Sequence, residues 1–83
     1  MSVTHPIVHL NGTSREELLR QLIDAGHAIN NALDMLRAAA PHQRDYYVSP
    51  EPLAYQKARQ EHEKRCAALA LVQNELQQIA EAL

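Results

Sequence analysis

The chain has 83 residues, a formal net charge of −2 and no Phe or Trp, so it predicts one small domain with little aromatic core. Hydrophobic residues make up 46% of the sequence, but many are alanines, which bury little area on folding. A chain this short with one cysteine has no internal disulfide, so we expect it to form a homo-oligomer. We expect no transmembrane segment, signal peptide or polybasic block, and the lone Cys66 is typical of the cytoplasm.

Residues 1–12 predict a short extended N-terminal arm. Pro6 cannot donate to a strand ladder, so a strand here lies at an edge or is confined to residues 7–10. The dipeptide Asn11-Gly12 then ends the arm. The arm residues that we expect in a contact between subunits are Ile7, Val8 and Leu10.

A first helix is predicted over residues 14–40. Ser14 suits the N-cap position, and Glu17 completes an S-x-x-E capping box. Pro41 ends the helix, because a residue before proline avoids helical dihedral angles. Apolar residues recur every seven positions, which is typical of a helix packed lengthwise against another. The rows assigned to this seam are Leu22, Ile29 and Leu36, and Leu18, Ala25, Ala32 and Ala39.

A second helix is predicted over residues 50–82, after a connection at residues 41–49. Pro50 and Pro52 fit its first turn, where no intrahelical donor is lost. Its heptad rows are Tyr55, His62, Leu69, Leu76 and Leu83, and Ala58, Arg65, Val72 and Ile79. Two such helices predict an all-α fold, an antiparallel hairpin over residues 13–83, with facing positions whose numbers add to about ninety.

Further apolar residues lie beside or outside these rows. They widen the apolar face beyond what one partner helix covers, so we expect hairpins to assemble into an oligomeric helical bundle. The residues that join the arm in these subunit contacts are Leu19, Ile23, Leu33, Leu53 and Leu71.

The connection gathers two of the three aromatic residues beside an arginine. Flat rings and a forked guanidinium suit a nucleobase with its phosphate, or the aromatic and acidic side chains of a protein partner. In a purely structural alternative, one tyrosine closes the end of the hairpin and Arg44 pairs with Asp45. Arg65, placed in the seam, is expected to face a ligand or a carboxylate. The residues predicted to bind a ligand are Arg44, Tyr46, Tyr47, His42 and Arg65.

We expect no metal, cofactor or catalytic site. His62 and Cys66 lie one helical turn apart, but zinc needs three or four converging ligands and no CxxC or HExxH motif supplies them. His5 and His9 are about 13 Å apart along a strand, too far for one ion. No Ser-His-Asp or Cys-His arrangement emerges, so enzyme activity is not expected. Eight Lys and Arg against ten Asp and Glu argue against a nucleic acid polymer as partner.

The chain resembles small, mostly uncharacterised helical-hairpin proteins of tailed bacteriophages. The similar segments are His9-Leu10-Asn11-Gly12-Thr13-Ser14-Arg15-Glu16-Glu17-Leu18-Leu19, the turn Ala39-Ala40-Pro41, and Arg44-Asp45-Tyr46-Tyr47. The resemblance covers most of the chain after the first eight residues. It implies a phage accessory protein, with a possible anti-defence role, acting in the bacterial cytoplasm. Small helical phage proteins include sponges for cyclic-nucleotide immune signals and inhibitors that dock on host proteins.

Two functions are therefore predicted, neither of them enzymatic. In the first, the protein sequesters a nucleotide-like ligand, such as a cyclic nucleotide, at its subunit interfaces. In the alternative, it is an interaction module that inhibits or bridges a host protein through the Arg-Asp-Tyr-Tyr connection. A phosphate binder needs several converging cations, and only Arg44 lies plainly in the connection.

Overall fold

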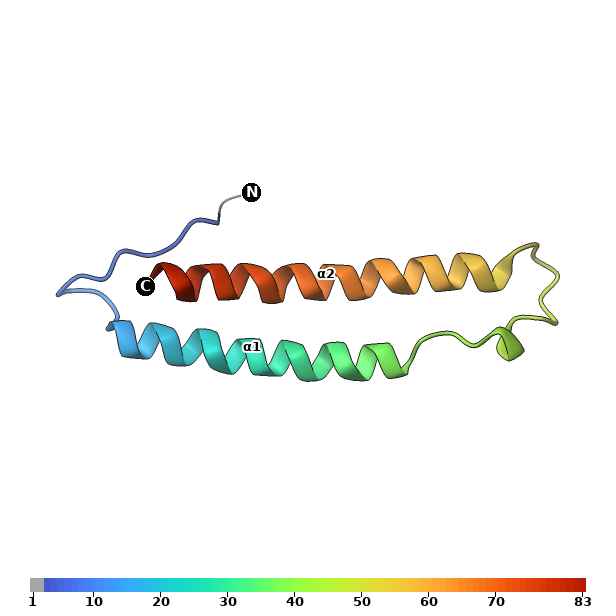
Figure 1. Cartoon of the computed structure of the whole chain (residues 1–83), viewed down its shortest axis with the longest axis horizontal. Helices are drawn as coiled ribbons and strands as arrows, with labels where there is room; N and C mark the ends of the chain where they lie inside the picture. The colour runs from blue at the N-terminus through green and yellow to red at the C-terminus, as the bar shows by residue number, and fades with distance from the viewer. Residues whose placement is uncertain (1–2) are drawn as a thin grey trace.

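A computed structural model describes residues 3–83 as two long helices joined at one end (Figure 1). Helix α1 spans Arg15–Ala38, a 3-10 turn η1 spans Gln43–Asp45, and helix α2 spans Ala54–Ala82. The helices run antiparallel and lie side by side, and the residues described contain no strand. The molecule measures 62 × 23 × 16 Å, so it is a rod rather than a sphere. The predicted all-helical hairpin is confirmed.

Helix α1 begins at the predicted cap. The Ser14 Oγ accepts a hydrogen bond of 3.2 Å from the backbone N–H of Glu17, which satisfies one of the free donors of the first turn. The Glu17 carboxylate forms no reciprocal bond to Ser14 in the residues described, and it accepts hydrogen bonds from Arg20 and Gln21 instead. The Arg20 hydrogen bond is also the main cause that lowers the pKa of Glu17. The capping box is therefore only half formed.

Prolines set the other helix boundaries. Helix α1 ends at Ala38, two residues before the predicted end, because Pro41 disfavours helical dihedral angles in the residue before it. Helix α2 begins at Ala54, four residues after the predicted start at residue 50. Pro52 disfavours helical dihedral angles at Glu51, and Leu53, in the left-handed region with φ 59° and ψ 28°, interrupts the helix immediately before Ala54.

The core is one seam between the two helices. Leu33 is its most buried apolar side chain, 5% exposed, and His62 is the buried polar one. The His62 Nε2 donates a hydrogen bond of 2.7 Å to the Leu36 carbonyl, and the Arg15 Nε donates one of 2.9 Å to the Leu83 oxygen. Both contacts join positions whose numbers add to 98. The predicted register of about ninety is therefore wrong, because the connection is longer than the sequence suggested.

One of the two α1 rows also differs from its prediction. The row that matches the prediction is half-buried and consists of Leu22, Ile29 and Leu36. The second row is shifted by one residue and consists of Leu19, Gly26 and Leu33. The alanines expected there are exposed, namely Ala25, Ala32 and Ala39. Leu33 thus belongs to the core of the hairpin itself, which corrects its predicted place in a subunit contact, and Leu19 shares its row.

Helix α2 supplies the expected first row and a modified second one. The first row lies in the seam as predicted, with buried or half-buried Tyr55, His62, Leu69, Leu76 and Leu83. In the second row Arg65 is exposed, and half-buried Cys66 lies in the seam instead. The interpretation of Arg65 as a seam residue is therefore wrong.

The segment before α1 has neither helix nor strand in the part of the chain that the structure describes. It turns where the Gly12 N–H donates to the His9 carbonyl at 3.1 Å, and it runs back over the open end of the hairpin (Figure 1). Ile7 and Leu10 are almost fully exposed, so their role in a subunit contact stays a prediction. Residues 1 and 2 of the predicted arm lie outside the described residues. Neither α1 nor α2 is long and apolar enough to cross a membrane.

Candidate functional site at the connection end

The connection, residues 39–53, lies beyond the end of α1 and closes one end of the hairpin (Figure 1). In the observed register Ala38 lies level with residue 60, so the first turns of α2 have no α1 residue opposite them. Tyr46 packs near Tyr55 there, with ring centroids 6.3 Å apart and an interplanar angle of 53°. Tilted aromatic pairs of this kind stabilise a contact beyond the area that they bury. One tyrosine therefore closes the hairpin end.

Successive short turns hold the connection in a defined shape. The Tyr47 N–H donates to the Gln43 carbonyl at 3.1 Å, and the Ser49 N–H donates to the Tyr46 carbonyl at 3.0 Å. Further along, the Ser49 Oγ accepts from the Glu51 N–H at 3.2 Å. The Glu51 carboxylate in turn accepts from the Lys57 Nζ of α2 at 2.8 Å. Backbone and side chain together thus anchor the connection to α2.

Leu53 marks the junction with α2 by an unfavourable backbone conformation. It has φ 59° and ψ 28°, the left-handed region, and it precedes the first residue of α2 without a side-chain cap. A residue with a Cβ costs about 1–2 kcal/mol in this region. Strain of this kind persists where the surrounding structure imposes it, and it clusters at functional sites.

The connection also exposes three large apolar side chains. Tyr47, Val48 and Leu53 are 77%, 76% and 65% exposed, and we call these three residues the tip patch. Beside them lies a shallow cavity of about 200 Å³. Its lining comes from the connection and the first turn of α2 and includes Gln43, Tyr46, Tyr47, Ser49, Glu51, Leu53, Ala54, Tyr55 and Gln56.

The structure brings together only part of the predicted ligand site. Tyr46 and Tyr47 line the cavity, but Arg44 and His42 are exposed and do not line it. Arg65 lies eleven residues into α2 from Ala54, about 16 Å along the helix axis. The only charged residue in the cavity wall is the carboxylate of Glu51. Lys57 does not line the cavity and is paired with Glu51 at 2.8 Å, so the tyrosines meet without an unpaired cation in the cavity wall.

Sequence reasoning missed several residues of this end. Val48, Leu53 and Gln56 were not assigned to the ligand site, and Tyr55 was assigned only to the seam. A signal was present, because large apolar residues follow Tyr47 in a stretch that two prolines keep out of a helix. The backbone conformation of Leu53 could not be predicted from sequence, since leucine rarely adopts the left-handed conformation.

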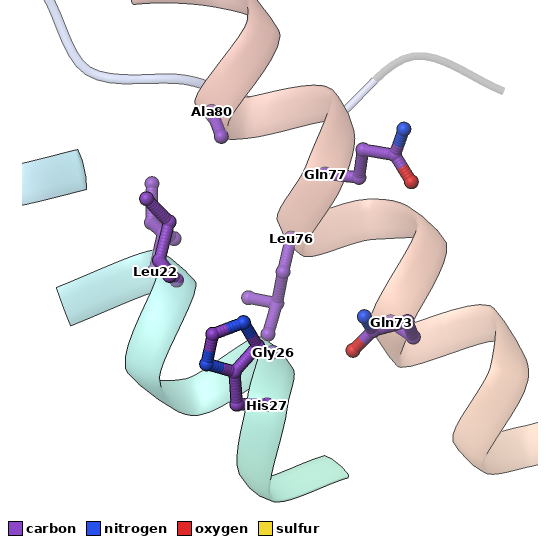
Figure 2. Close-up of a pocket in the computed structure, with 8 residues that line it drawn as sticks. Leu22, Gly26, His27, Gln73, Leu76, Gln77 and Ala80 are labelled. Carbon is purple, nitrogen blue, oxygen red and sulfur yellow. The ribbon is translucent and has the colours of Figure 1, made fainter. Parts of the chain in front are cut away.

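A second cavity of about 200 Å³ lies along the seam near its middle (Figure 2). Gly26 leaves a gap there opposite Gln73, whose Oε1 is buried without a hydrogen-bond partner among the described residues. His27 and Gln77 lie at its rim, and no Asp, Glu, Lys or Arg lines it. Across residues 3–83 no three His, Cys, Asp or Glu side chains converge to hold a metal ion. This cavity is a gap in the seam packing and offers little to a charged ligand.

Comparison of the chain with protein-family models, with curated proteins and with solved structures gave no significant match. The resemblance to phage proteins therefore stays a prediction. The functional argument rests on the geometry of the connection end.

Proposed function

We propose that the protein is a non-enzymatic interaction module that docks on another protein through the tip patch. The observation that supports this is the exposure of Tyr47, Val48 and Leu53 together at one end of the rod. Aromatic and aliphatic side chains that are exposed together are typical of the central contacts of protein interfaces. The turns that fix the connection also reduce the entropy lost on docking, because the backbone is already ordered.

The geometry favours this function over nucleotide sequestration. A nucleotide phosphate needs several converging positive charges, whereas the one charged side chain in the lining of the cavity beside Tyr47 is Glu51, which is paired with Lys57. The predicted cations are spread out, with Arg44 outside the cavity and Arg65 far along α2. Sequestration of a nucleotide-like ligand between subunits stays a prediction, which requires a second subunit to supply the missing cations.

The tip patch is tested by comparing three forms of the protein as bait in a bacterial lysate, the source that the phage resemblance implies. The forms are the wild type, the double variant Tyr47→Ser/Val48→Ser, and the control Met35→Ser/Leu71→Ser. The control removes two exposed apolar residues from the outer helix faces. We expect one protein to bind the wild type and the control with equal yield, and to be lost from the tip variant. Retention by the tip variant would contradict the proposal.

A thermal-shift screen with cyclic di- and trinucleotides separates the two functions. The interaction module predicts the same unfolding temperature with and without each nucleotide. Nucleotide sequestration predicts a rise in that temperature which Tyr47→Ala or Arg44→Ala abolishes. A rise of that kind would replace the proposed function with the alternative.

A further inference from the structure

The three aromatic residues of the chain all line the cavity at the connection end, which we call the tyrosine cavity. Tyr46 and Tyr47 come from the connection and Tyr55 from the first turn of α2, and the sequence has no Phe or Trp. The face of an aromatic ring carries partial negative charge. Three rings around one cavity therefore favour a positively charged guest.

The rings are set at an angle and are not stacked on one another. The centroids of Tyr46 and Tyr55 lie 6.3 Å apart with an interplanar angle of 53°, so neither ring covers the whole face of the other. Tyr47 beside them is 77% exposed, which leaves its ring open to a guest from solvent. A cation is attracted to a ring when it lies over the face within about 6 Å of the centroid. A guest in the tyrosine cavity can meet this condition.

A carboxylate adds a full negative charge to the same cavity. Glu51 is the one charged residue of its lining among residues 3–83. The Glu51 N–H donates to the Ser49 Oγ at 3.2 Å, which holds the backbone of this residue in place. The Lys57 Nζ donates to the Glu51 Oε1 at 2.8 Å, and no donor in the part of the chain that the structure describes bonds to Oε2. The carboxylate can therefore accept hydrogen bonds from a second cation.

The ion pair with Lys57 leaves the cavity open to such a guest. Lys57 does not line the cavity, so its ammonium approaches Glu51 from outside. Both side chains of the pair are more than half exposed. Ion pairs at the surface contribute little to stability, since water screens them. A guest that shares Glu51 with Lys57, or replaces Lys57, thus meets little opposition.

The size and the polar groups of the cavity favour the guanidinium of an arginine. Its volume of about 200 Å³ is below the roughly 300–1,000 Å³ of pockets for drug-sized ligands, which suits a single side chain. A guanidinium is planar, stacks on aromatic rings and donates to a carboxylate with two N–H groups, whereas an ammonium is compact and strongly hydrated. Gln43 and Gln56 also line the cavity, and amide oxygens accept from the remaining N–H groups.

We propose that the tyrosine cavity receives an arginine side chain of the protein that docks on the tip patch. The guanidinium stacks on the tyrosine rings and donates to the Glu51 carboxylate. This inference rests on the proposed docking function and adds the chemistry of its central contact. Arginine and tyrosine are among the residues that contribute most to binding at protein interfaces, so the pairing suits such a contact.

Two small probes of nearly the same shape test the cavity in the full chain. They are N-acetyl-arginine-amide, which is a cation, and N-acetyl-citrulline-amide, which is neutral. Nuclear magnetic resonance at millimolar probe concentration is expected to show that the arginine probe shifts the ring signals of all three tyrosines. The citrulline probe is expected to bind about fivefold more weakly or less tightly still, because it lacks the charge. Equal binding of the two probes would overturn the proposal.

Two carboxylates of the connection supply a matched pair of variants. Glu51→Gln is expected to raise the dissociation constant of the arginine probe about fivefold or more, because it removes the charge from the cavity wall. Asp45→Asn removes an exposed carboxylate outside the cavity lining and is expected to change that constant by about twofold or less. Equal effects would show that the probe responds to overall charge and would overturn the proposal.

Tyr47→Leu keeps an apolar side chain at this position but removes the ring. It is expected to raise the dissociation constant of the arginine probe about threefold, because the cation–π contact is lost. Unchanged binding would contradict a role for the Tyr47 ring. Far-UV circular dichroism of each variant checks that the helices are retained, and the comparison of the two probes on the wild type does not depend on any variant.

The bait experiment separates failure of this inference from failure of the docking function. The Glu51→Gln bait is expected to lose most of the captured protein, as the Tyr47→Ser/Val48→Ser bait does. If the Glu51→Gln bait retains that protein with wild-type yield, the docking function stands and the arginine inference is wrong. If the wild type binds the arginine probe but captures no protein, the docking function is contradicted, and with it the assignment of the arginine to a protein partner.

Discussion

His62 is a polar residue at a position where a seam normally carries leucine or alanine. It is buried, and its Nε2 donates to the Leu36 carbonyl in the last turn of α1, an oxygen that also accepts from the Ala39 N–H at 3.1 Å. A shift of α2 by one turn would break this bond, because it would carry the imidazole away from the Leu36 carbonyl. A buried polar residue of this kind specifies the register of packed helices. The sequence showed that His62 belongs to the seam, but not which carbonyl it meets.

Gly26 is a seam residue whose replacement by alanine is expected to stabilise the protein. An added Cβ would lie 3.5 Å from the Gln73 Nε2, which is ordinary contact distance, and the backbone of Gly26 is helical. The close approach of the two helices therefore does not require a glycine at this position.

Gly26→Ala is expected to stabilise the protein by about 1 kcal/mol, because alanine is favoured over glycine in a helix interior. The free energy of unfolding is measured by urea denaturation at fixed protein concentration. Ala28→Gly, on an exposed face of the same helix, is the control and is expected to destabilise by a similar amount. Destabilisation by Gly26→Ala would show that the gap opposite Gln73 serves the packing.

At the scale of elements, sequence patterns predicted both helices and their antiparallel pairing. The capping residue Ser14 fixed the start of α1 correctly, since its signal is local. The predicted register was wrong, since facing positions add to 98 and not to about ninety, which is about one turn on each helix. The sum depends on the path of the connection. The shifted row of α1 has a simple cause, as Gly26 interrupts the apolar pattern that Leu19 and Leu33 would otherwise share.

The sequence predicted where the candidate site lies and that it contains tyrosines, but it did not predict all of its residues. The tyrosines are concentrated in a short stretch, and Tyr46 and Tyr47 indeed line one cavity. Arg65 was grouped with them by its heptad position, and helix geometry places it elsewhere. The conformation of Leu53 depends on how the connection joins α2, which no local pattern reveals.

Leu53 separates stability from docking. Leu53→Gly is expected to stabilise the hairpin by about 0.5–1 kcal/mol, because glycine adopts the left-handed region without strain and the exposed leucine loses little packing. The same variant is expected to weaken capture of the docking partner, since it removes one residue of the tip patch. Urea denaturation and the bait experiment measure the two effects. Leu53→Ala, which retains the strain, should weaken capture without the gain in stability.

At the scale of the whole molecule, the rod shape means that the radius of gyration distinguishes one mode of self-association from another. The radius of gyration is 18.4 Å, against about 12 Å for a compact domain of this length. This value is dominated by the long axis, so association along a broad side adds little to it.

If the predicted homo-oligomer is a pair of hairpins side by side, small-angle X-ray scattering is expected to show the mass of a dimer with a radius of gyration of only about 19 Å, given helix axes about 9 Å apart. Association end to end through the tip patch would nearly double the radius instead. That outcome would place the self-contact at the connection and contradict side-by-side association.

The heptad repeat of the seam also means that the rod could be longer or shorter while its two helices keep the same contacts. Seven residues add about 10 Å to a helix and return the same face to its partner. A matched heptad inserted into α1 and α2 would thus move the connection away from the open end while keeping the seam residues in phase. The number of heptads in the two helices therefore sets the distance between the open end of the hairpin and the connection.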